Sequence, residues 1–228
     1  MTKLLLVHGA WHNGAGFARL QDELRSRGIE SETIELSSVA RSDEEIGDMY
    51  RDAQLVRERI DGSSDDYFVL AHSYGGLPVT QGLVGASNVK GLIFLTAFVL
   101  DENETLFAAC GSQDPAWWVR NSDNTRLTTA NPVDVFYNTC APDVASAAAS
   151  QLRTHSLASF NQPITAVAWK SIPSTYIICE RDNAIPVFAQ EAMSARCTSV
   201  RRIDSDHSPF LSSVTELGAM IESIIRAG

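Results

Sequence analysis

Short runs of apolar residues alternate along the chain with longer segments in which apolar residues recur at helical spacing. The runs at 4–7 and 67–71 are rich in Leu, Val and Phe, as expected for strands that are buried on both faces of a sheet. Further strands are predicted at 32–36, 89–98, 175–179 and 200–203, and helices at 16–27, 43–60, 75–84, 186–195 and 209–226. This alternation predicts an α/β protein with a mostly parallel sheet and helices on both of its faces.

The predicted helix at 43–60 starts with polar residues. Ser42, Asp43, Glu44 and Glu45 suit a helix N-terminus, where hydroxyl and carboxylate oxygens accept hydrogen bonds from free backbone N–H groups. We therefore place the start of this helix at these residues.

Residues 101–170 interrupt the alternation. They contain four prolines, two adjacent tryptophans and an Ala-rich stretch that predicts a helix at 143–152. A segment of this length between two strands of one sheet is too long for an ordinary loop. We interpret it as a small inserted helical cap within a single domain at 1–228, whose core consists of residues 1–100 and 171–228.

Composition and charge limit the classes of partner that the protein is expected to bind. The chain has 18 Lys and Arg against 28 Asp and Glu, a net charge of −10, so phosphate backbones and anionic lipids are repelled and neither nucleic acid nor membrane is an expected partner. The apolar run at 4–7 is too short for a signal peptide, and no stretch approaches the roughly 20 apolar residues of a membrane span. A cytoplasmic monomer or homodimer is expected. Free thiols are expected at four positions that form no CxxC pair: Cys110, Cys140, Cys179 and Cys197.

Ser73 is the candidate nucleophile. It follows the predicted strand at 67–71 and precedes a predicted helix, in the strand–turn–helix context of the G-x-S-x-G nucleophile elbow. The tight turn requires small residues two positions before and after the serine, and these are Ala71 and Gly75. The alternative is a serine that only caps the helix.

A catalytic serine needs a base and an acid that orients the base, and in proteins with this elbow the acid and then the base follow the serine along the chain. His207 lies on a loop after the last predicted strand, at the sheet edge where ligands bind, and is our candidate base; His155 falls in the cap. Asp182 follows the preceding strand and is the candidate acid. Glu180 is the alternative acid or a surface salt-bridge partner of Arg181, and Asp206 is expected to be a loop or capping residue.

Further residues are assigned around this set. The backbone N–H groups of Ala10 and Tyr74 are the expected oxyanion-hole donors. Large side chains near the serine either line a substrate pocket or pack the cap onto the core, and those we assign to substrate binding are Trp11, His12, Trp118 and Phe136. His8 is expected to be structural or to line the pocket, and the side chain of His72 is expected to point away from that of Ser73. The sequence contains no metal-binding cluster, and no metal or organic cofactor is expected.

Four motifs carry a family resemblance: LLLVHGAWH at 4–12, LAHSYGG at 70–76, ERDNAIP at 180–186 and SDHSPFL at 205–211. Together they resemble the α/β-hydrolase superfamily, and within it the small branch of plant methylesterases, plant hydroxynitrile lyases and short bacterial esterases. The resemblance implies about six parallel strands and a helical cap at 101–170. Hydroxynitrile lyases of this branch carry a Thr after the first strand and a Lys behind the catalytic His, where this sequence has Gly9 and Ser208.

The sequence thus favours a serine hydrolase that cleaves small to medium, hydrophobic carboxylic esters through an acyl-enzyme on Ser73. A ligand-binding receptor on the same scaffold and a cofactor-free lyase are the alternatives, and lactones or amides remain possible substrates.

Overall fold

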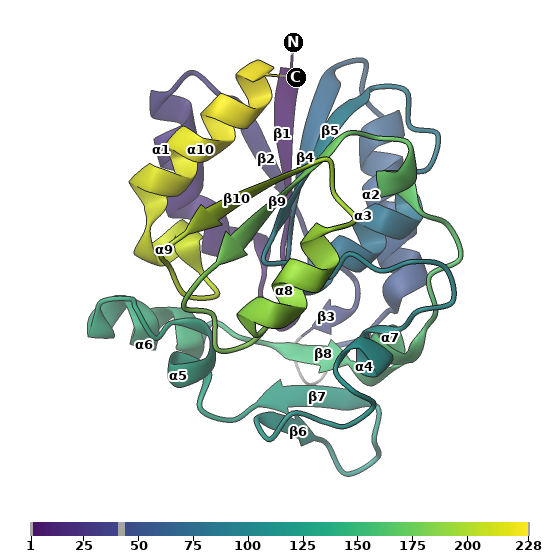
Figure 1. Ribbon diagram of the computed structural model, residues 1–228. Helices are drawn as coiled ribbons and strands as arrows, with labels where there is room; N and C mark the ends of the chain where they lie inside the picture. Colours follow the sequence, from purple (N-terminus) through teal and green to yellow (C-terminus); the bar gives the residue numbers. More distant parts are fainter. Residues whose placement is uncertain (1, 41–43, 228) are drawn as a thin grey trace.

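The computed structural model describes residues 2–40 and 44–227, and within them a sheet of six parallel strands forms the centre of the molecule (Figure 1). The order across the sheet is β10-β9-β5-β4-β1-β2. The strands are β1 (Thr2–Val7), β2 (Ser31–Ile34), β4 (Asp66–His72), β5 (Val89–Leu95), β9 (Ser174–Cys179) and β10 (Ser199–Ile203). The predicted fold class, a mostly parallel sheet of about six strands, is confirmed.

Helices cover both faces of the sheet. Successive residues of a strand point to opposite sides, so each strand contributes side chains to both helical layers. Leu4 and Leu6 of β1 pack with α1 (Ala18–Ser26), α9 (Pro209–Ser212) and α10 (Val214–Ala227). Leu5 and Val7 belong to the core on the other face, beneath α2 (Met49–Asp61), α3 (Gly76–Gly82) and α8 (Val187–Ser194). The near-continuous apolar runs in the sequence therefore reflect burial on both faces.

Two helices differ from the prediction at their ends. The helix predicted at 43–60 begins only at Met49, because Asp48 has an extended backbone and its side chain accepts a hydrogen bond from Arg51 N as the N-cap. Glu44 and Glu45 precede this helix, and the predicted Ser42 and Asp43 lie outside the described residues. The closing helix is divided into α9 and α10 because Ser213 adopts non-helical backbone angles.

The chain between β5 and β9, which the sequence assigns to the cap, contains helices and also short strands that the sequence did not predict. The helices are α4 (Leu106–Ala109), α5 (Pro132–Phe136), α6 (Pro142–Ser150) and α7 (Leu157–Asn161). The strands β6 (Trp118–Arg120), β7 (Arg126–Thr129) and β8 (Thr154–Ser156) form an antiparallel sheet, and β3 (Val39–Ala40), from before the cap, adds a fourth strand beside β8. Figure 1 shows this small sheet below the carboxyl ends of the central strands.

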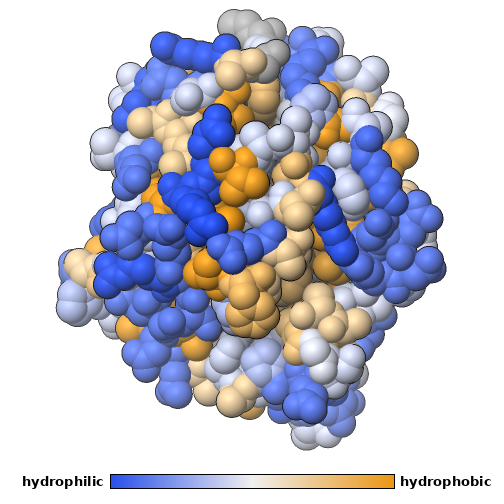
Figure 2. Space-filling view, viewed as in Figure 1, coloured by the Kyte–Doolittle hydropathy of each residue, from blue (hydrophilic) through white to orange (hydrophobic). Residues whose placement is uncertain are grey.

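The face of the molecule seen in Figure 2 is largely polar. Hydrophilic side chains cover most of the face seen in Figure 2, with smaller hydrophobic areas between them. Within 2–40 and 44–227, no helix is long and apolar enough to cross a membrane. All four cysteines are free thiols.

Candidate active site

Ser73 lies in the sharp turn between β4 and α3. Its backbone adopts φ = 54°, a left-handed conformation that is rare for a serine and that is typical of a strained elbow. The turn packs against β1 so closely that a Cβ on Gly75 would lie 2.7 Å from the carbonyl oxygen of His8 and 2.8 Å from that of Val7. Gly75 therefore permits the turn, as the motif predicts.

His207 and Asp182 are joined by a buried hydrogen bond. Asp182 follows β9 and His207 follows β10, so both project from the carboxyl edge of the sheet. Nδ1 of His207 donates to Oδ2 of Asp182 at 2.7 Å, and both side chains are almost completely inaccessible to solvent. With Nδ1 protonated in this bond, Nε2 of a neutral His207 is left as the basic nitrogen.

Further donors fix the carboxylate of Asp182. The N–H groups of Ala184 and Ile185 donate to Oδ1 at 2.6 and 2.9 Å, and Oγ1 of Thr96 donates to Oδ2 at 2.5 Å. Nε2 of Gln190 approaches Oδ2 at 3.5 Å. No motif in the sequence marks Thr96 or Gln190, because both reach Asp182 only through the tertiary fold.

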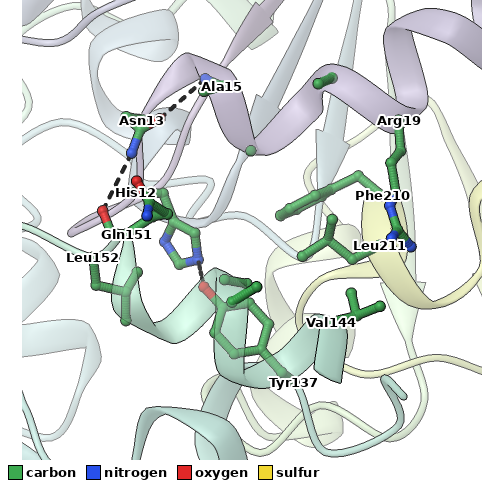
Figure 3. Close-up of a pocket in the computed structure, with 14 residues that line it drawn as sticks. His12, Asn13, Ala15, Arg19, Tyr137, Val144, Gln151, Leu152, Phe210 and Leu211 are labelled. Atoms are coloured by element: carbon green, nitrogen blue, oxygen red, sulfur yellow. Dashed lines mark hydrogen bonds between the residues drawn. The ribbon is translucent and has the colours of Figure 1, made fainter. Parts of the chain in front are cut away.

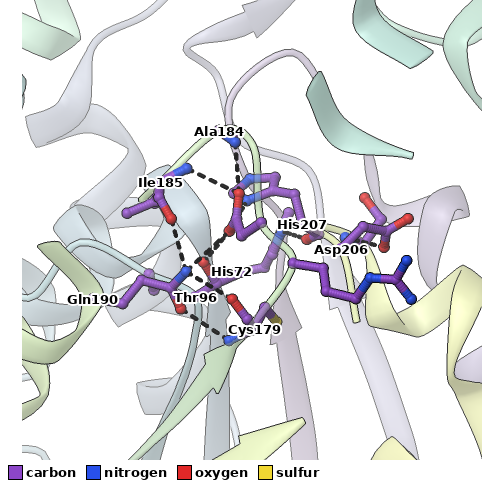
Figure 4. Close-up of polar contacts among 12 residues, drawn as sticks. His72, Thr96, Cys179, Ala184, Ile185, Gln190, Asp206 and His207 are labelled. Atoms are coloured by element: carbon purple, nitrogen blue, oxygen red, sulfur yellow. Dashed lines mark hydrogen bonds and ion pairs between the residues drawn. The ribbon is translucent and has the colours of Figure 1, made fainter. Parts of the chain in front are cut away.

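The side chain of His72 is hydrogen-bonded to the backbone of His207. Its Nε2 lies 2.8 Å from the carbonyl oxygen of His207, to which it donates, and its side chain is completely buried (Figure 4). Burial, more than the neighbouring His207, holds the pKa of His72 well below its usual value. His72 is therefore a neutral support for the loop that carries His207.

Ser73 and His207 line one small cavity, of about 30 Å³, between core and cap. Three of the four side chains assigned to substrate binding, Trp11, Trp118 and Phe136, also line it. Ala10 and Tyr74, the expected oxyanion-hole donors, belong to the same lining. Among the described residues around this cavity, none is Lys, Arg, Asp or Glu, and the other lining residues are Phe98, Leu106, Cys110, Pro115, Trp117, Phe160, Ala184 and Ile185.

The model of the alpha/beta hydrolase family matches residues 4–218, nearly the whole chain. The protein belongs to the alpha/beta hydrolase family. The relatives of this alpha/beta hydrolase include the alpha/beta hydrolase nvfD of Aspergillus novofumigatus, which is 27% identical over 96% of this chain and 95% of its own.

Solved structures agree with this fold. A pyrethroid hydrolase from Sphingobium faniae superposes with a TM-score of 0.84 at 20% identity, over 100% of this chain and 98% of its own. The methylesterase MES16 from Arabidopsis superposes with a TM-score of 0.85 at 19% identity, over all of both chains. The family and its esterase and hydrolase members support a hydrolase activity, and the expected resemblance is confirmed.

The remaining histidines of this alpha/beta hydrolase have structural partners. Nδ1 of His8 donates to the carbonyl oxygen of Gly9 and its Nε2 accepts from the N–H of Leu36. His12, which we assigned to substrate binding, lies outside the lining of the cavity at Ser73. It lines a neighbouring pocket instead, where its Nε2 is 2.9 Å from the hydroxyl of Tyr137.

Two acidic residues near the site have other partners than His207. Asp206 is buried and accepts hydrogen bonds from the N–H groups of Ser208 and Thr139, so it organises the loop. Glu180 forms an exposed ion pair with Arg202, not with Arg181. Within the described part of the chain, no three His, Cys, Asp or Glu side chains are grouped to hold a metal ion.

Proposed function

We propose that this alpha/beta hydrolase cleaves carboxylic esters through an acyl-enzyme formed on Ser73. The observation that carries the proposal is the placement of Ser73, in an elbow with φ = 54°, in the same cavity as His207, whose Nδ1 is bonded to Asp182 at 2.7 Å. A serine hydroxyl is a weak nucleophile without such a base, and the base needs an acid that fixes its tautomer.

In the proposed mechanism, Oγ of Ser73 attacks the ester carbonyl while Nε2 of His207 takes its proton. Asp182 remains ionised and stabilises the imidazolium that forms. The backbone N–H groups of Ala10 and Tyr74 stabilise the oxyanion. His207 then protonates the departing alcohol, and a water molecule, deprotonated by the same nitrogen, releases the acid from Ser73.

The cavity favours a hydrophobic substrate group of small to medium size. Seven of its fifteen described lining residues are Trp, Phe or Tyr, including Trp11, Trp118 and Phe136. A volume of about 30 Å³ is far below the several hundred Å³ of a typical ligand site, so these side chains have to move apart when substrate enters. We therefore expect the best substrates to be esters with one compact apolar group, because these require the smallest movement of the wall side chains.

A hydroxynitrile lyase reaction has less support. The described lining of the cavity contains no Lys or Arg that could stabilise a departing cyanide ion. A Cβ on Gly9 would lie 2.8 Å from Cβ of Ser73, so the threonine of the lyases has no room at this position. Both observations favour the ester hydrolase.

The test measures hydrolysis of p-nitrophenyl acetate, butyrate and octanoate by the wild-type protein and by Ser73→Ala. We expect turnover of at least one ester, and a fall in kcat of about a thousandfold or more in the variant. Ser146→Ala, an exposed change on α6, is the control and should retain wild-type activity. Absence of turnover on all three esters, or equal turnover by Ser73→Ala, would overturn the proposal.

A further inference from the structure

A second pocket lies between the cap and the core, beside the candidate active site. Its volume is about 290 Å³, roughly ten times that of the cavity at Ser73. Helix α6 of the cap forms one wall, while α1 and α9 of the core form the other (Figure 3). The two hollows share no lining residue among those described. We name the larger one the α6 pocket.

The walls of the α6 pocket are apolar. Val144 and Ala148, one turn apart on α6, face Phe210 and Leu211 of α9, and Leu152 closes one end. The alanines of α6 are too small to fill the space between the two helices. The pocket therefore offers an apolar slot at the lower end of the size range of small-molecule sites.

Arg19 is the one charged residue in the described lining of the α6 pocket. Its side chain is exposed, extends beside Phe210 and Leu211 in Figure 3, and forms no ion pair with any described residue. Arg19 lies in the first turn of α1, where a positive charge opposes the helix dipole. Neither a partner among the described residues nor helix stability thus accounts for a cation at this position.

A neutral pair of side chains forms the floor of the α6 pocket. Nδ1 of His12 donates to the carbonyl oxygen of Ala10 at 2.7 Å, so its Nε2 accepts from the hydroxyl of Tyr137 at 2.9 Å. Burial lowers the pKa of His12 to about 3, so the imidazole carries no charge at neutral pH. Among the described lining residues, Arg19 is therefore the sole source of positive charge for a ligand.

This pair and its neighbour also separate the α6 pocket from the active site. Phe136, which precedes Tyr137, lines the cavity at Ser73, and its ring lies 5.3 Å from that of His12 and 5.5 Å from that of His207. One layer of aromatic rings thus stands between the two hollows.

We propose that the α6 pocket binds a small hydrophobic monocarboxylate. The apolar tail lies between α6 and α9, and the carboxylate meets the guanidinium of Arg19 at the rim. A single exposed cation on a protein of net charge −10 suits one negative charge better than a phosphate or a polyanion. Guanidinium and carboxylate groups match in geometry and form paired hydrogen bonds.

The test compares three probes of equal chain length by titration calorimetry: octanoate, 1-octanol and octylammonium. We expect octanoate to bind most tightly and octylammonium most weakly. Arg19→Gln should weaken octanoate binding about threefold to fivefold, the range of an exposed ion pair, and should leave 1-octanol binding unchanged. Arg25→Gln, on the same helix but outside the α6 pocket, is the matched control and should bind octanoate like the wild type.

A second variant distinguishes the two hollows. Ala148→Trp fills the α6 pocket and should abolish binding of both octanoate and 1-octanol, whereas a ligand in the cavity at Ser73 would be unaffected. Octanoate that binds equally to wild type, Arg19→Gln and Ala148→Trp would overturn the proposal, as would no octanoate binding up to its solubility limit. Because Arg19 is exposed, the Arg19→Gln comparison stays decisive even if Ala148→Trp folds poorly.

Discussion

At the scale of single residues, two buried carboxylates are held by neutral donors in place of cations. Asp182 accepts from Thr96, Ala184 and Ile185 as well as from His207. Asp52 of α2 is completely buried and accepts from two serines of the preceding loop and from the hydroxyl of Tyr74, the residue after Ser73. A buried charge of this kind persists only when hydrogen bonds replace the lost water.

Thr96→Val should impair catalysis more than folding. The change removes one donor to Asp182 while keeping shape and volume, so His207 loses part of its orientation. We expect kcat/KM for the best p-nitrophenyl ester to fall about tenfold, the equivalent of roughly 1.4 kcal/mol, with little change in KM.

Thr80→Val is the matched control. Thr80 is equally buried, and its hydroxyl has no hydrogen-bond partner in the part of the chain that the structure describes. This variant should retain the wild-type kcat. Equal effects of the two substitutions would show that Thr96 acts only through packing.

Local sequence signals were sufficient to propose Ser73, Asp182 and His207, because each follows an apolar strand run at the same edge of the sheet. No such signal marks Thr96 or Asp52, whose partners lie far away along the chain. The assignment of His12 shows the same limit: the motif places it near the serine, but only the fold shows that it lines the α6 pocket.

At the scale of elements, the strands of the central sheet were predictable and those of the cap were not. A strand buried on both faces produces a continuous apolar run, whereas β6, β7 and β8 have three or four residues each, and β6 and β7 include exposed positions. β6 and β7 pair as a local hairpin, but β8 pairs with β3 and β7, which are distant in sequence. Tertiary contacts, not periodicity, therefore determine the cap.

The junction of β4 and α3 should tolerate no added carbon at Gly75. In Gly75→Ala, the new Cβ would meet two backbone oxygens of the β1 end, which cannot rotate away. We expect a loss of several kcal/mol of folding free energy or no soluble protein, measured as the urea midpoint of unfolding. Gly16→Ala, whose Cβ has no neighbour closer than 4.0 Å, should change the midpoint little. Similar midpoints for both variants would contradict this account.

At the scale of the whole molecule, four of the five histidines are buried, and burial favours their neutral form. Burial is the largest cause that lowers the pKa of each, and His12 reaches about 3. The unfolded chain binds these protons near the ordinary value of 6.5, so below that pH it holds more protons than the folded chain. The four residues are His8, His12, His72 and His155.

Stability should consequently fall on mild acidification. Each neutral histidine costs up to about 1.4 kcal/mol of folding free energy per pH unit below 6.5. Urea midpoints at pH 7.5, 6.5 and 5.5 should decline, with most of the loss between the last two. His155→Gln should reduce the pH dependence of the unfolding free energy by the equivalent of one proton, whatever its effect on stability at pH 7.5. A midpoint that is constant from pH 7.5 to 5.5 would refute this expectation.

The pairing of β3 with β8 has a consequence for recombination between relatives. Val39 lies opposite His155 and Ala40 opposite Thr154, so a segment that precedes α2 forms the border of the cap sheet. An exchange of residues 101–170 alone would place a foreign strand against this border. A segment exchanged between relatives therefore has to include residues 39–40 as well as 101–170 if both strands of this pairing are to come from one parent.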